Sequence, residues 1–360
     1  MLGGRETGNE TYVVNLLAGL AAIKDITCGA VVLPGAQIPQ HLRQADITFL
    51  TLPSTSNWVR LLRGLPALCR EWDADALHCT YIGPWTAPCP LVLSVHDVVF
   101  KRYPEFFSPR DRLLFSTLFP LSLRRAAKII AISNHARREI EHYFPSVQGK
   151  TVVTLLAADP RFHPVERALL RGMRERFNLQ GRFILTVGNL QPRKNLLRVI
   201  QAFAGICERV AGVKLAVVGK EQWKSSEIYR QVEALGLANE VVFTGYVSPE
   251  DLVALYNLAE LFVYPSLYEG FGLPVLEAMQ CGTPVVSSNG TSIPEVAGEA
   301  ARLVDPLKVD EIAAAMLTML TDPGAGADLR AKGFAQARKF TWENAAERTA
   351  EVYRSLVCTG

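Results

Sequence analysis

The segment EGFGLPVLEA, residues 269–278, places two carboxylates eight positions apart, on either side of a stretch of Gly, Phe and Pro. Gly270 and Gly272 let a ligand approach the backbone closely, and the proline that follows suits the first turn of a helix. The N–H groups of a helix start favour an anion. Glu269 and Glu277 accept hydrogen bonds only when they are ionised, so they suit hydroxyl groups. A nucleotide sugar, with its ribose, diphosphate and hexose, offers all of these groups.

The same two acids have a plainer interpretation, in which Glu269 is a loop acid and Glu277 complements a helix dipole, and spacing alone does not decide between the two. A second segment, GNLQPRKN at residues 188–195, shifts the balance. It follows another expected strand, and Arg193 and Lys194 bring two cations to the sheet edge, where a diphosphate could bind. By themselves two such cations are more typical of a solvated helix start.

Short runs rich in Val, Ile and Leu alternate with helical patterns along the chain. Because the runs are continuous, they predict an α/β protein with parallel sheets covered on both faces, in two doubly wound domains. The 360 residues also exceed the ~250–300 at which a single core stops growing. We expect an N-terminal domain over 1–165, a C-terminal domain over 166–340, and a final helix, 341–357, that packs back towards the first. The expected strands cover residues 28–33, 46–52, 91–97, 127–133, 182–188, 214–219, 240–245, 261–266, 283–288 and 301–306.

The beginning of the chain departs from this pattern. A doubly wound domain normally starts with a strand that leads into a glycine loop. Here the Gly-containing loop MLGGRETGNE comes first and leads directly into an expected helix over 10–23. We therefore expect the N-terminal domain to lack its first strand.

Composition excludes several classes of protein. A net charge of +3 is too small to indicate a nucleic-acid partner. Seven cysteines without a C-x-x-C pair indicate reduced thiols, and neither a signal peptide nor an apolar run of ~20 residues is present, so we expect a cytoplasmic protein. The segment 101–128 mixes basic and aromatic residues; a core helix pair with solvated basic faces is slightly favoured over a surface that binds anionic lipid at the inner face of the membrane.

From FILTVGNLQPRKNL through FTGYVSPEDL and LFVYPSLYEGFGLPVLEAMQCGTPVVSSNG, the chain resembles the family 4 glycosyltransferases, which are retaining enzymes of the GT-B fold. This resemblance implies two Rossmann-like domains that face each other across a cleft. It also implies transfer of a hexose, mannose or glucose-like, from a GDP- or UDP-sugar to a carbohydrate or lipid-linked acceptor in envelope or exopolysaccharide synthesis. No cofactor and no metal are expected. Rival hypotheses are a sugar-nucleotide epimerase of the same fold and a non-catalytic nucleotide-sugar-binding protein.

The resemblance also assigns roles to individual residues. Arg193 and Lys194 would neutralise the departing diphosphate, Glu269 would lie beside the donor hexose, and Glu277 would bind the ribose. His96 in SVHD would face the reacting sugar carbon, although an imidazole beside Asp97 is by itself more typical of a structural histidine. DAD, residues 73–75, is interpreted as a polar strand entry and not as a metal motif. The remaining expected donor contacts are Gly8, Gly188, Asn189, Tyr246, Val247, Phe271, Gly272 and Leu273.

Overall fold

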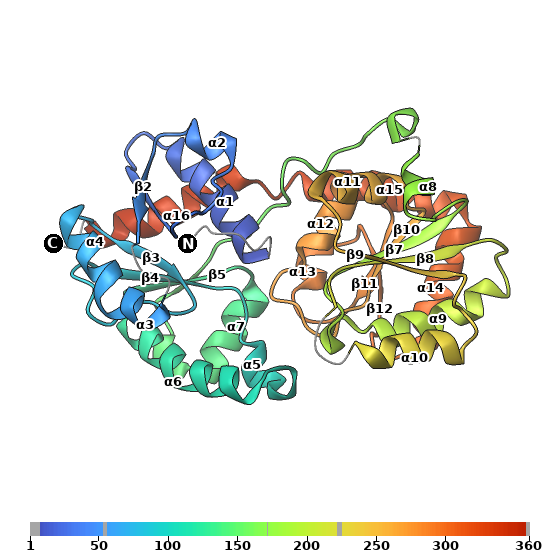
Figure 1. Cartoon of the computed structure of the whole chain (residues 1–360), viewed down its shortest axis with the longest axis horizontal. Coiled ribbons are helices and arrows are strands. Elements are labelled where there is room, and N and C mark those ends of the chain that lie inside the picture. The colour runs from blue at the N-terminus through green and yellow to red at the C-terminus, as the bar shows by residue number, and fades with distance from the viewer. Residues whose placement is uncertain (1–7, 53–55, 171, 222–224, 358–360) are drawn as a thin grey trace. The chain divides into compact units, whose positions relative to one another are not determined.

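A computed structural model describes residues 8–52, 56–170, 172–221 and 225–357. The chain divides into two compact units (Figure 1). Unit 1 comprises residues 1–157 and 340–360, and unit 2 comprises residues 158–339. The division falls earlier in the chain than position 165, and the last helix belongs to unit 1.

Unit 1 contains two parallel sheets, one formed by β1 and β2 and the other in the order β3-β4-β5-β6. The last helix, red in Figure 1, packs against α1, the helix closest to the N-terminus. Elements of unit 1 are α1 (Gly8–Ala21), β1 (Cys28–Val32), α2 (Gln40–Arg43), β2 (Ile47–Thr51), α3 (Asn57–Val59), η1 (Arg60–Gly64), α4 (Leu65–Glu71), β3 (Leu77–Thr80), β4 (Leu91–Val95), α5 (Val99–Arg102), η2 (Pro104–Phe106), α6 (Pro109–Arg125), β5 (Lys128–Ala131), α7 (Asn134–Tyr143), η3 (Pro145–Val147), β6 (Thr151–Val153) and α16 (Trp342–Val357).

Unit 2 is a single parallel sheet in the order β12-β11-β10-β7-β8-β9. Figure 1 shows α9, α10 and α14 on one side of its strands and α11, α12 and α15 on the other. Elements of unit 2 are η4 (Arg167–Leu170), α8 (Met173–Arg176), β7 (Phe183–Val187), η5 (Pro192–Lys194), α9 (Leu196–Cys207), β8 (Lys214–Val218), α10 (Ser226–Ala234), β9 (Val241–Gly245), α11 (Pro249–Leu258), β10 (Leu261–Tyr264), α12 (Leu273–Gln280), β11 (Val285–Ser288), α13 (Ile293–Ala297), β12 (Arg302–Val304), α14 (Val309–Thr321) and α15 (Pro323–Ala337).

The core of unit 2 follows from its sequence pattern. Strand residues such as Ile184 and Val217 are almost fully buried, and the apolar face of α9, which includes Val199 and Phe203, covers them. Continuous apolar strands bury both of their faces only when helices cover both sides of the sheet. In this sheet, the order of the strands along the chain reverses between β7 and β10, as in a Rossmann fold. Sheets of this kind bind ligands at the position where the order reverses.

Side-chain caps start several of the helices at the sheet edges. Ser133 accepts a hydrogen bond from the N–H of Ala136 at the start of α7, and Ser248 accepts one from the N–H of Asp251 at the start of α11. Each cap supplies an acceptor for a helix-start N–H that would otherwise have none, and is worth about 1 kcal/mol. Polar residues after apolar strands thus fix where the helices begin, which in turn fixes the loops between them.

Every expected strand is present, and the structure adds two that the sequence pattern missed. DAD was interpreted as a polar strand entry, and it precedes the first of them, β3, whose side chains after Leu77 are only partly buried. The second, β6, is an edge strand of three partly buried residues. Both are short and form by pairing with β4 and β5, which is a tertiary effect. The expected helix over 10–23 is α1, and the segment that precedes it lies outside the described residues.

The segment 101–128 consists mainly of α6, which buries Leu118, Phe119 and Leu123 and exposes Leu113 and Leu121. Its buried face is that of an ordinary core helix. Within the described part of the chain, no helix is both long enough and apolar enough to cross a membrane.

The ends of β7 and β8 approach so closely that they require glycine. Gly219 has φ +152°, and an added Cβ would lie 2.2 Å from the carbonyl oxygen of Gly188. We expect Gly219→Ala to lower the free energy of unfolding of β7 and β8 by about 2 kcal/mol or more, because backbone must move. Hydrogen exchange of the amides in these two strands measures this change.

The control for this substitution is Gly205→Ala in α9. Nothing lies within 4 Å of its added Cβ, so the helix should gain about 0.5–1 kcal/mol. Equal protection of β7 in the two variants would contradict the close approach of the two strands.

Candidate functional site

The candidate site of unit 2 lies at the carboxyl ends of β7 and β10, where the strand order reverses. Gly188 directly follows β7 and has φ +144°, a backbone conformation that residues with a side chain rarely adopt. The chain then forms η5, which carries Arg193 and Lys194, and the loop after β10 carries Glu269. Parallel pairing of β7 with β10 is the reason that residues more than seventy positions apart meet at one edge.

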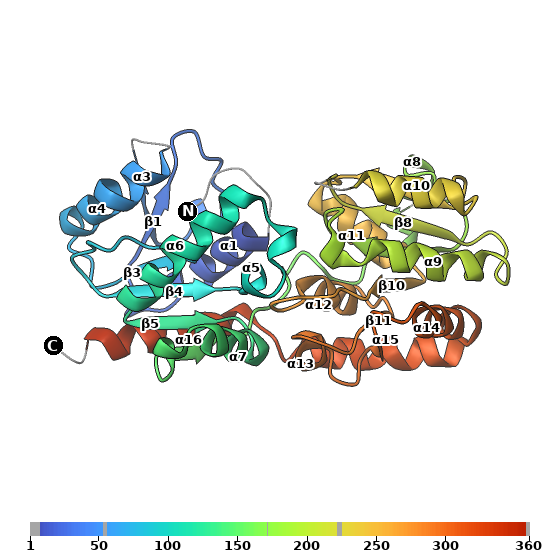
Figure 2. The ribbon, with the colours of Figure 1, turned by 90° about the horizontal axis from the view of Figure 1, so that it is seen from below.

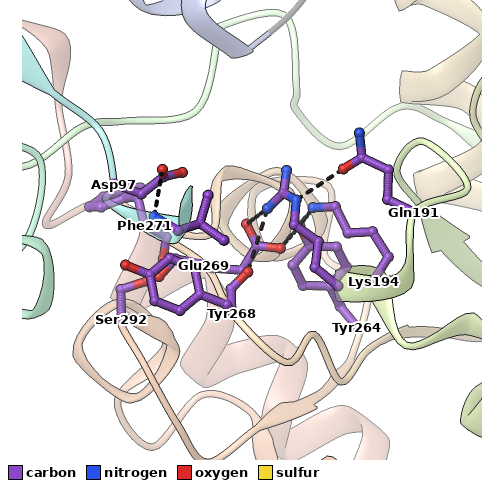
Figure 3. A network of polar contacts seen from close by, with 10 residues as sticks. Asp97, Gln191, Lys194, Tyr264, Tyr268, Glu269, Phe271 and Ser292 are labelled. Carbon is purple, nitrogen blue, oxygen red and sulfur yellow. Dashed lines mark hydrogen bonds and ion pairs between the residues drawn. The ribbon is translucent and has the colours of Figure 1, made fainter. Parts of the chain in front are cut away.

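Glu269 is the centre of a buried polar network (Figure 3). Its Oε1 accepts hydrogen bonds from Lys194 Nζ at 2.7 Å and from the Tyr264 hydroxyl at 2.9 Å. Its Oε2 accepts one from an Arg193 guanidinium N–H at 3.2 Å. Lys194 also donates to the Tyr264 hydroxyl, and its ammonium lies 4.6 Å from the centre of that ring. The carboxylate therefore joins the loop after β7 to the loop after β10.

The charges in this network decide its protonation. Burial opposes ionisation of Glu269, but the positive charges of Lys194 and Arg193, with the hydrogen bonds from Lys194 and Tyr264, outweigh it and lower the pKa to about 2. Glu269 is thus ionised at neutral pH. The sequence had treated this acid and the two cations as separate features, and the structure shows them as one ion-pair network.

Neighbouring contacts hold the network in place. The side chain of Gln191 accepts a hydrogen bond from Arg193 at 3.0 Å, and the backbone carbonyl of Arg193 accepts one from the N–H of Leu267 at 2.8 Å. Asn195 donates to the carbonyl of Pro265 at 2.9 Å. The first bond lies within the loop after β7, and the other two join this loop to the loop after β10, so both loops are fixed by several partners. Sequence reasoning missed Gln191 and Tyr264, although both lie within the segments it singled out.

The helix start beside Glu269 requires its glycine. Gly272 is the N-cap of α12 with φ +112°, and an added Cβ would lie 2.6 Å from Ile293 Cδ1. The Ser292 hydroxyl lies 2.9 Å from the carbonyl oxygen of Glu269 and 2.8 Å from that of Phe271, which fixes the loop before α12. Leu273 is the first residue of the helix, so the backbone of the expected donor contacts leads into a helix N-terminus.

Glu277 lies on α12 and is only partly buried. It accepts a hydrogen bond from the Tyr256 hydroxyl at 3.0 Å. Burial raises the pKa of Glu277 to about 7, with a smaller contribution in the same direction from the charge of Asp159. The sequence analysis treated Glu277 as an ionised acceptor; with this pKa it is only partly ionised at neutral pH. Asp159 and Tyr256 carry no sequence signal that would have placed them beside it.

The remaining expected residues of unit 2 follow β7 and β9. Asn189 Oδ1 accepts a hydrogen bond from the N–H of Lys220 at 3.3 Å, which ties the loop after β7 to the end of β8. Tyr246 is 47% exposed, and Lys220 Nζ lies 4.2 Å from the centre of its ring, whereas Val247 is buried. An exposed aromatic face beside a cation can stack on a planar ring.

Two expected site residues belong to unit 1. Gly8 is the first residue of α1. His96 follows β4 and is buried, with its ring centre 4.7 Å from that of Tyr12. Its Nε2 has no hydrogen-bond partner among the described residues, and burial lowers the pKa of the imidazole to about 4. His96 is therefore neutral at physiological pH. The neighbouring Asp97 accepts the N–H of Val99, as a residue at a helix start does.

DAD does not combine with other acidic, histidine or cysteine side chains. Within the described ranges, no group of three or more such residues lies close enough to hold a metal ion. Asp73 has φ 49° at the turn between α4 and β3, a conformation that Asp adopts more readily than most residues.

Glu269→Gln tests the buried ion-pair network. The substitution removes the negative charge that offsets Lys194 and Arg193, so we expect the free energy of unfolding of β7 and β10 at pH 7 to fall by about 3–5 kcal/mol. Because the folded pKa of Glu269 is lower than its ordinary value of 4.5, its stabilisation is present above that value and is lost as the pH falls through about 2. Hydrogen exchange of the two strands as a function of pH measures both effects.

Glu311→Gln is a matched control for this experiment. Glu311 pairs with Lys308 at 2.8 Å, nearly the distance of the Lys194 pair, but both side chains are well exposed. Solvent screens such a pair, so this variant should exchange like the wild type. If Glu269→Gln behaves in the same way, the network does not stabilise unit 2.

Glu277→Gln tests the raised pKa on α12. A carboxyl group with a raised folded pKa stabilises the protein below its ordinary value of 4.5 and loses that contribution as the pH rises through about 7. We expect the stability of the wild type relative to the variant to fall by about 1–3 kcal/mol between these limits. Exchange of the α12 amides over pH 4–8 measures the difference, and a pH-independent difference would contradict the raised pKa.

Models of known protein families match both units of the chain. A family model described as glycosyl transferases group 1 matches residues 173–340, and one described as Glycosyltransferase Family 4 matches residues 7–161. O-antigen chain mannosyltransferase B of Escherichia coli is 37% identical over 269 residues, which are 74% of this chain and 70% of that protein. The serotype-specific mannosyltransferase WbdA of Escherichia coli is 36% identical over 283 residues; these are 76% of this chain and 34% of WbdA, so the chain spans about a third of WbdA.

Solved structures match the fold over nearly the whole chain. HepE of Anabaena in complex with UDP and glucose has a TM-score of 0.76 at 21% identity, covering 99% of this chain and 98% of HepE. Sucrose-phosphate synthase of Thermosynechococcus elongatus has a TM-score of 0.77 at 22% identity, covering 98% of this chain and 94% of that one. At such identities the likeness concerns the fold, which is GT-B. The sequence matches and this fold together show that the chain belongs to the group 1, family 4 glycosyltransferases and is a hexosyltransferase built from two Rossmann-like units.

Proposed function

We propose that this glycosyltransferase moves a hexose from a nucleotide diphosphate sugar to a hydroxyl of a carbohydrate or lipid-linked acceptor, with retention of anomeric configuration, in polysaccharide assembly. The observation that carries the proposal is the buried network of Glu269, Lys194 and Arg193 where the strand order of unit 2 reverses. Apolar residues could stabilise this part of the sheet as well as a buried ion-pair network does, so folding alone does not explain the network. A diphosphate, in contrast, needs positive charges that are held in fixed positions.

The diphosphate would bind at the start of α12. Two cations against one carboxylate leave this network with one net positive charge. Arg193 is 26% exposed in its side chain, so its guanidinium reaches the surface of unit 2. The N-terminus of α12, opened by Gly272, adds backbone donors and a favourable dipole. Together these groups offer a phosphate both charge and oriented hydrogen bonds.

The nucleoside would extend from this position along unit 2. Glu277 would bind the ribose hydroxyls, and its pKa of about 7 allows the carboxyl group to accept a hydrogen bond or donate one. The backbone at Tyr246 and Val247 would contact the base, and the exposed Tyr246 ring offers a stacking surface. The hexose would lie beside Glu269 and the backbone of Phe271 and Gly272.

In the proposed reaction, the bond between the anomeric carbon and the phosphate oxygen breaks, and a bond from that carbon to the acceptor oxygen forms on the same face. The proton of the acceptor hydroxyl passes to the leaving diphosphate. Negative charge therefore develops on the diphosphate, where Arg193, Lys194 and the start of α12 stabilise it. Each such preorganised donor is worth about 2.7–4 kcal/mol in the transition state. The reaction so described needs no metal ion.

His96 would face the sugar from unit 1. With its pKa lowered to about 4, it offers a neutral imidazole whose buried Nε2 can bond a sugar hydroxyl, and it adds no positive charge. The donor is proposed to be a GDP- or UDP-sugar. The names of the relatives favour mannose as the hexose, and UDP accompanies HepE.

Titration calorimetry of the chain with GDP, UDP and ADP tests the donor half-site. We expect one nucleotide to bind, and Glu277→Ala to weaken its binding about 10- to 100-fold, because the ribose loses a hydrogen-bonding partner. Glu311→Gln, on the exposed ion pair of the same unit, should bind like the wild type. If the two variants bind equally well, Glu277 does not contact the nucleoside.

Incubation with the matching nucleotide sugar then separates the rival functions. A transferase gives a glycosylated acceptor and releases nucleoside diphosphate only when the acceptor is present. An epimerase converts the donor into its isomer without an acceptor, and a non-catalytic binding protein leaves the donor intact. Either of the last two results would overturn the proposed reaction while leaving the donor half-site in place.

A further inference from the structure

Tyr256 is a fully buried tyrosine whose hydroxyl group faces the acid expected to bind the ribose. It lies on α11, and its hydroxyl donates a hydrogen bond to Glu277 Oε2 on α12 at 3.0 Å. The two helices contact each other on one side of the unit 2 sheet (Figure 1). Within the described part of the chain, no other group forms a hydrogen bond with this carboxyl group. The orientation of Glu277 therefore depends on a single donor.

Packing around the ring fixes the position of the Tyr256 hydroxyl. Phe162 and Phe262 meet the Tyr256 ring edge to face, with their ring centres 5.6 Å and 5.3 Å away. The backbone carbonyl of Tyr256 accepts a hydrogen bond from the Thr283 hydroxyl at 2.6 Å. Close packing on several sides leaves a buried ring little freedom to turn. The hydroxyl is thus held towards Glu277.

The direction of this hydrogen bond is also fixed. Burial, together with the charge of Glu277, raises the pKa of Tyr256 well above its ordinary value of 10.0, so the phenol keeps its proton. An ionised carboxyl group can only accept hydrogen bonds, and a bond to the ionised form favours that form. Tyr256 therefore opposes the effect of burial, which raises the pKa of Glu277.

The other ionisable groups near this carboxyl group do not replace the bond. The charge of Asp159 raises the carboxyl pKa further, whereas the charges of Lys194 and Arg161 lower it. Cys281, at the end of α12, is a neutral thiol because burial raises its pKa. Among the described residues, Tyr256 is thus the neighbour that both orients the carboxylate and favours its charge.

We propose that Tyr256 is a positioning residue for the donor, because its hydroxyl holds Glu277 as an oriented carboxylate that accepts hydrogen bonds from both ribose hydroxyls. The two neighbouring hydroxyls of a ribose offer two donors side by side. A carboxylate can accept both and keep its bond to Tyr256, since each oxygen has two lone pairs. A protonated Glu277 loses one of these acceptors. This inference rests on the proposed function, in which Glu277 binds the ribose, and adds the residue that sets the pH range of this binding.

Nucleotide affinity measured as a function of pH tests this role. Tyr256→Phe removes the hydroxyl and keeps the ring that packs against Phe162 and Phe262. Without its donor, Glu277 has a higher pKa and is mostly protonated at pH 7. For whichever of GDP, UDP and ADP binds the wild type, we expect the Kd of the variant to be about tenfold higher at pH 7 and within about threefold of the wild type at pH 9. The ratio of the two Kd values at each pH cancels titration of the nucleotide itself.

A double-mutant cycle separates this role from packing. In a Glu277→Ala chain there is no carboxylate to position, so adding Tyr256→Phe should leave the Kd unchanged to within about twofold at every pH. The matched control is Tyr229→Phe. Tyr229 also donates to a glutamate, Glu221, at 2.6 Å, but this bond is exposed and water can replace it. The control variant should bind nucleotide like the wild type over the whole pH range.

A second measurement covers a Tyr256→Phe chain that does not fold. Incorporation of 3-fluorotyrosine in place of tyrosine makes each phenol a stronger donor with little change in size, so Glu277 ionises at a lower pH. We expect the nucleotide Kd of the fluorinated chain at pH 6 to be about threefold lower than that of the ordinary chain. The two values should agree when both chains carry Glu277→Ala.

The possible failures are distinct. If the wild type binds a nucleotide and Tyr256→Phe binds it equally well, or more weakly by a factor that does not change with pH, the inference is overturned and the donor half-site stands. Additive effects of Tyr256→Phe and Glu277→Ala also overturn it, as does equal binding by the fluorinated and ordinary chains at pH 6. If the wild type binds none of the three nucleotides, the proposed function fails, and the role of Tyr256 fails with it.

Discussion

The carboxylate of Glu269 connects the two loops on which the candidate site of unit 2 depends. It accepts hydrogen bonds from Lys194 and Arg193, which follow β7, and from Tyr264, which ends β10. Burial of three charges is costly unless they are paired and fully hydrogen-bonded, so a single geometry of the two loops is strongly preferred. The same positive charges and hydrogen bonds lower the pKa of Glu269. Any ligand at the start of α12 therefore meets charges that are already in position.

The topology of the sheet brings these groups together. Because the strand order reverses between β7 and β10, their following loops diverge to opposite faces and leave the sheet edge between them accessible. Glycines then permit the close approach: Gly188 and Gly219 at the ends of β7 and β8, and Gly272 at the start of α12. The chain belongs to a family of glycosyltransferases, and this edge is the site that we propose for the donor.

Unit 1 also alternates parallel strands with helices, but β3 and β4 follow each other with no helix between them. Its strands form two separate sheets, one that ends at β1 and one that ends at β3. The same region holds the network of His78, Ser94, Tyr12 and Tyr353, and His96 packs on Tyr12. The position of His96 is thus coupled to the packing of α1, which carries Tyr12.

The sequence alone determined the alternation of strands and helices, because continuous apolar runs and glycine or proline boundaries are local signals. It also determined the two segments that hold Arg193, Lys194, Glu269 and Glu277, since charged residues after apolar strands lie at a sheet edge. Only the tertiary structure decided that Glu269 is the partner of Lys194 and Arg193, because residues this far apart meet through strand pairing. The same holds for the pKa of Glu277, which depends on burial and on Asp159 and Tyr256 from distant segments. The sequence pattern missed the short strands β3 and β6 for the same reason. These strands form because they pair with β4 and β5, and their own residues show no continuous apolar run.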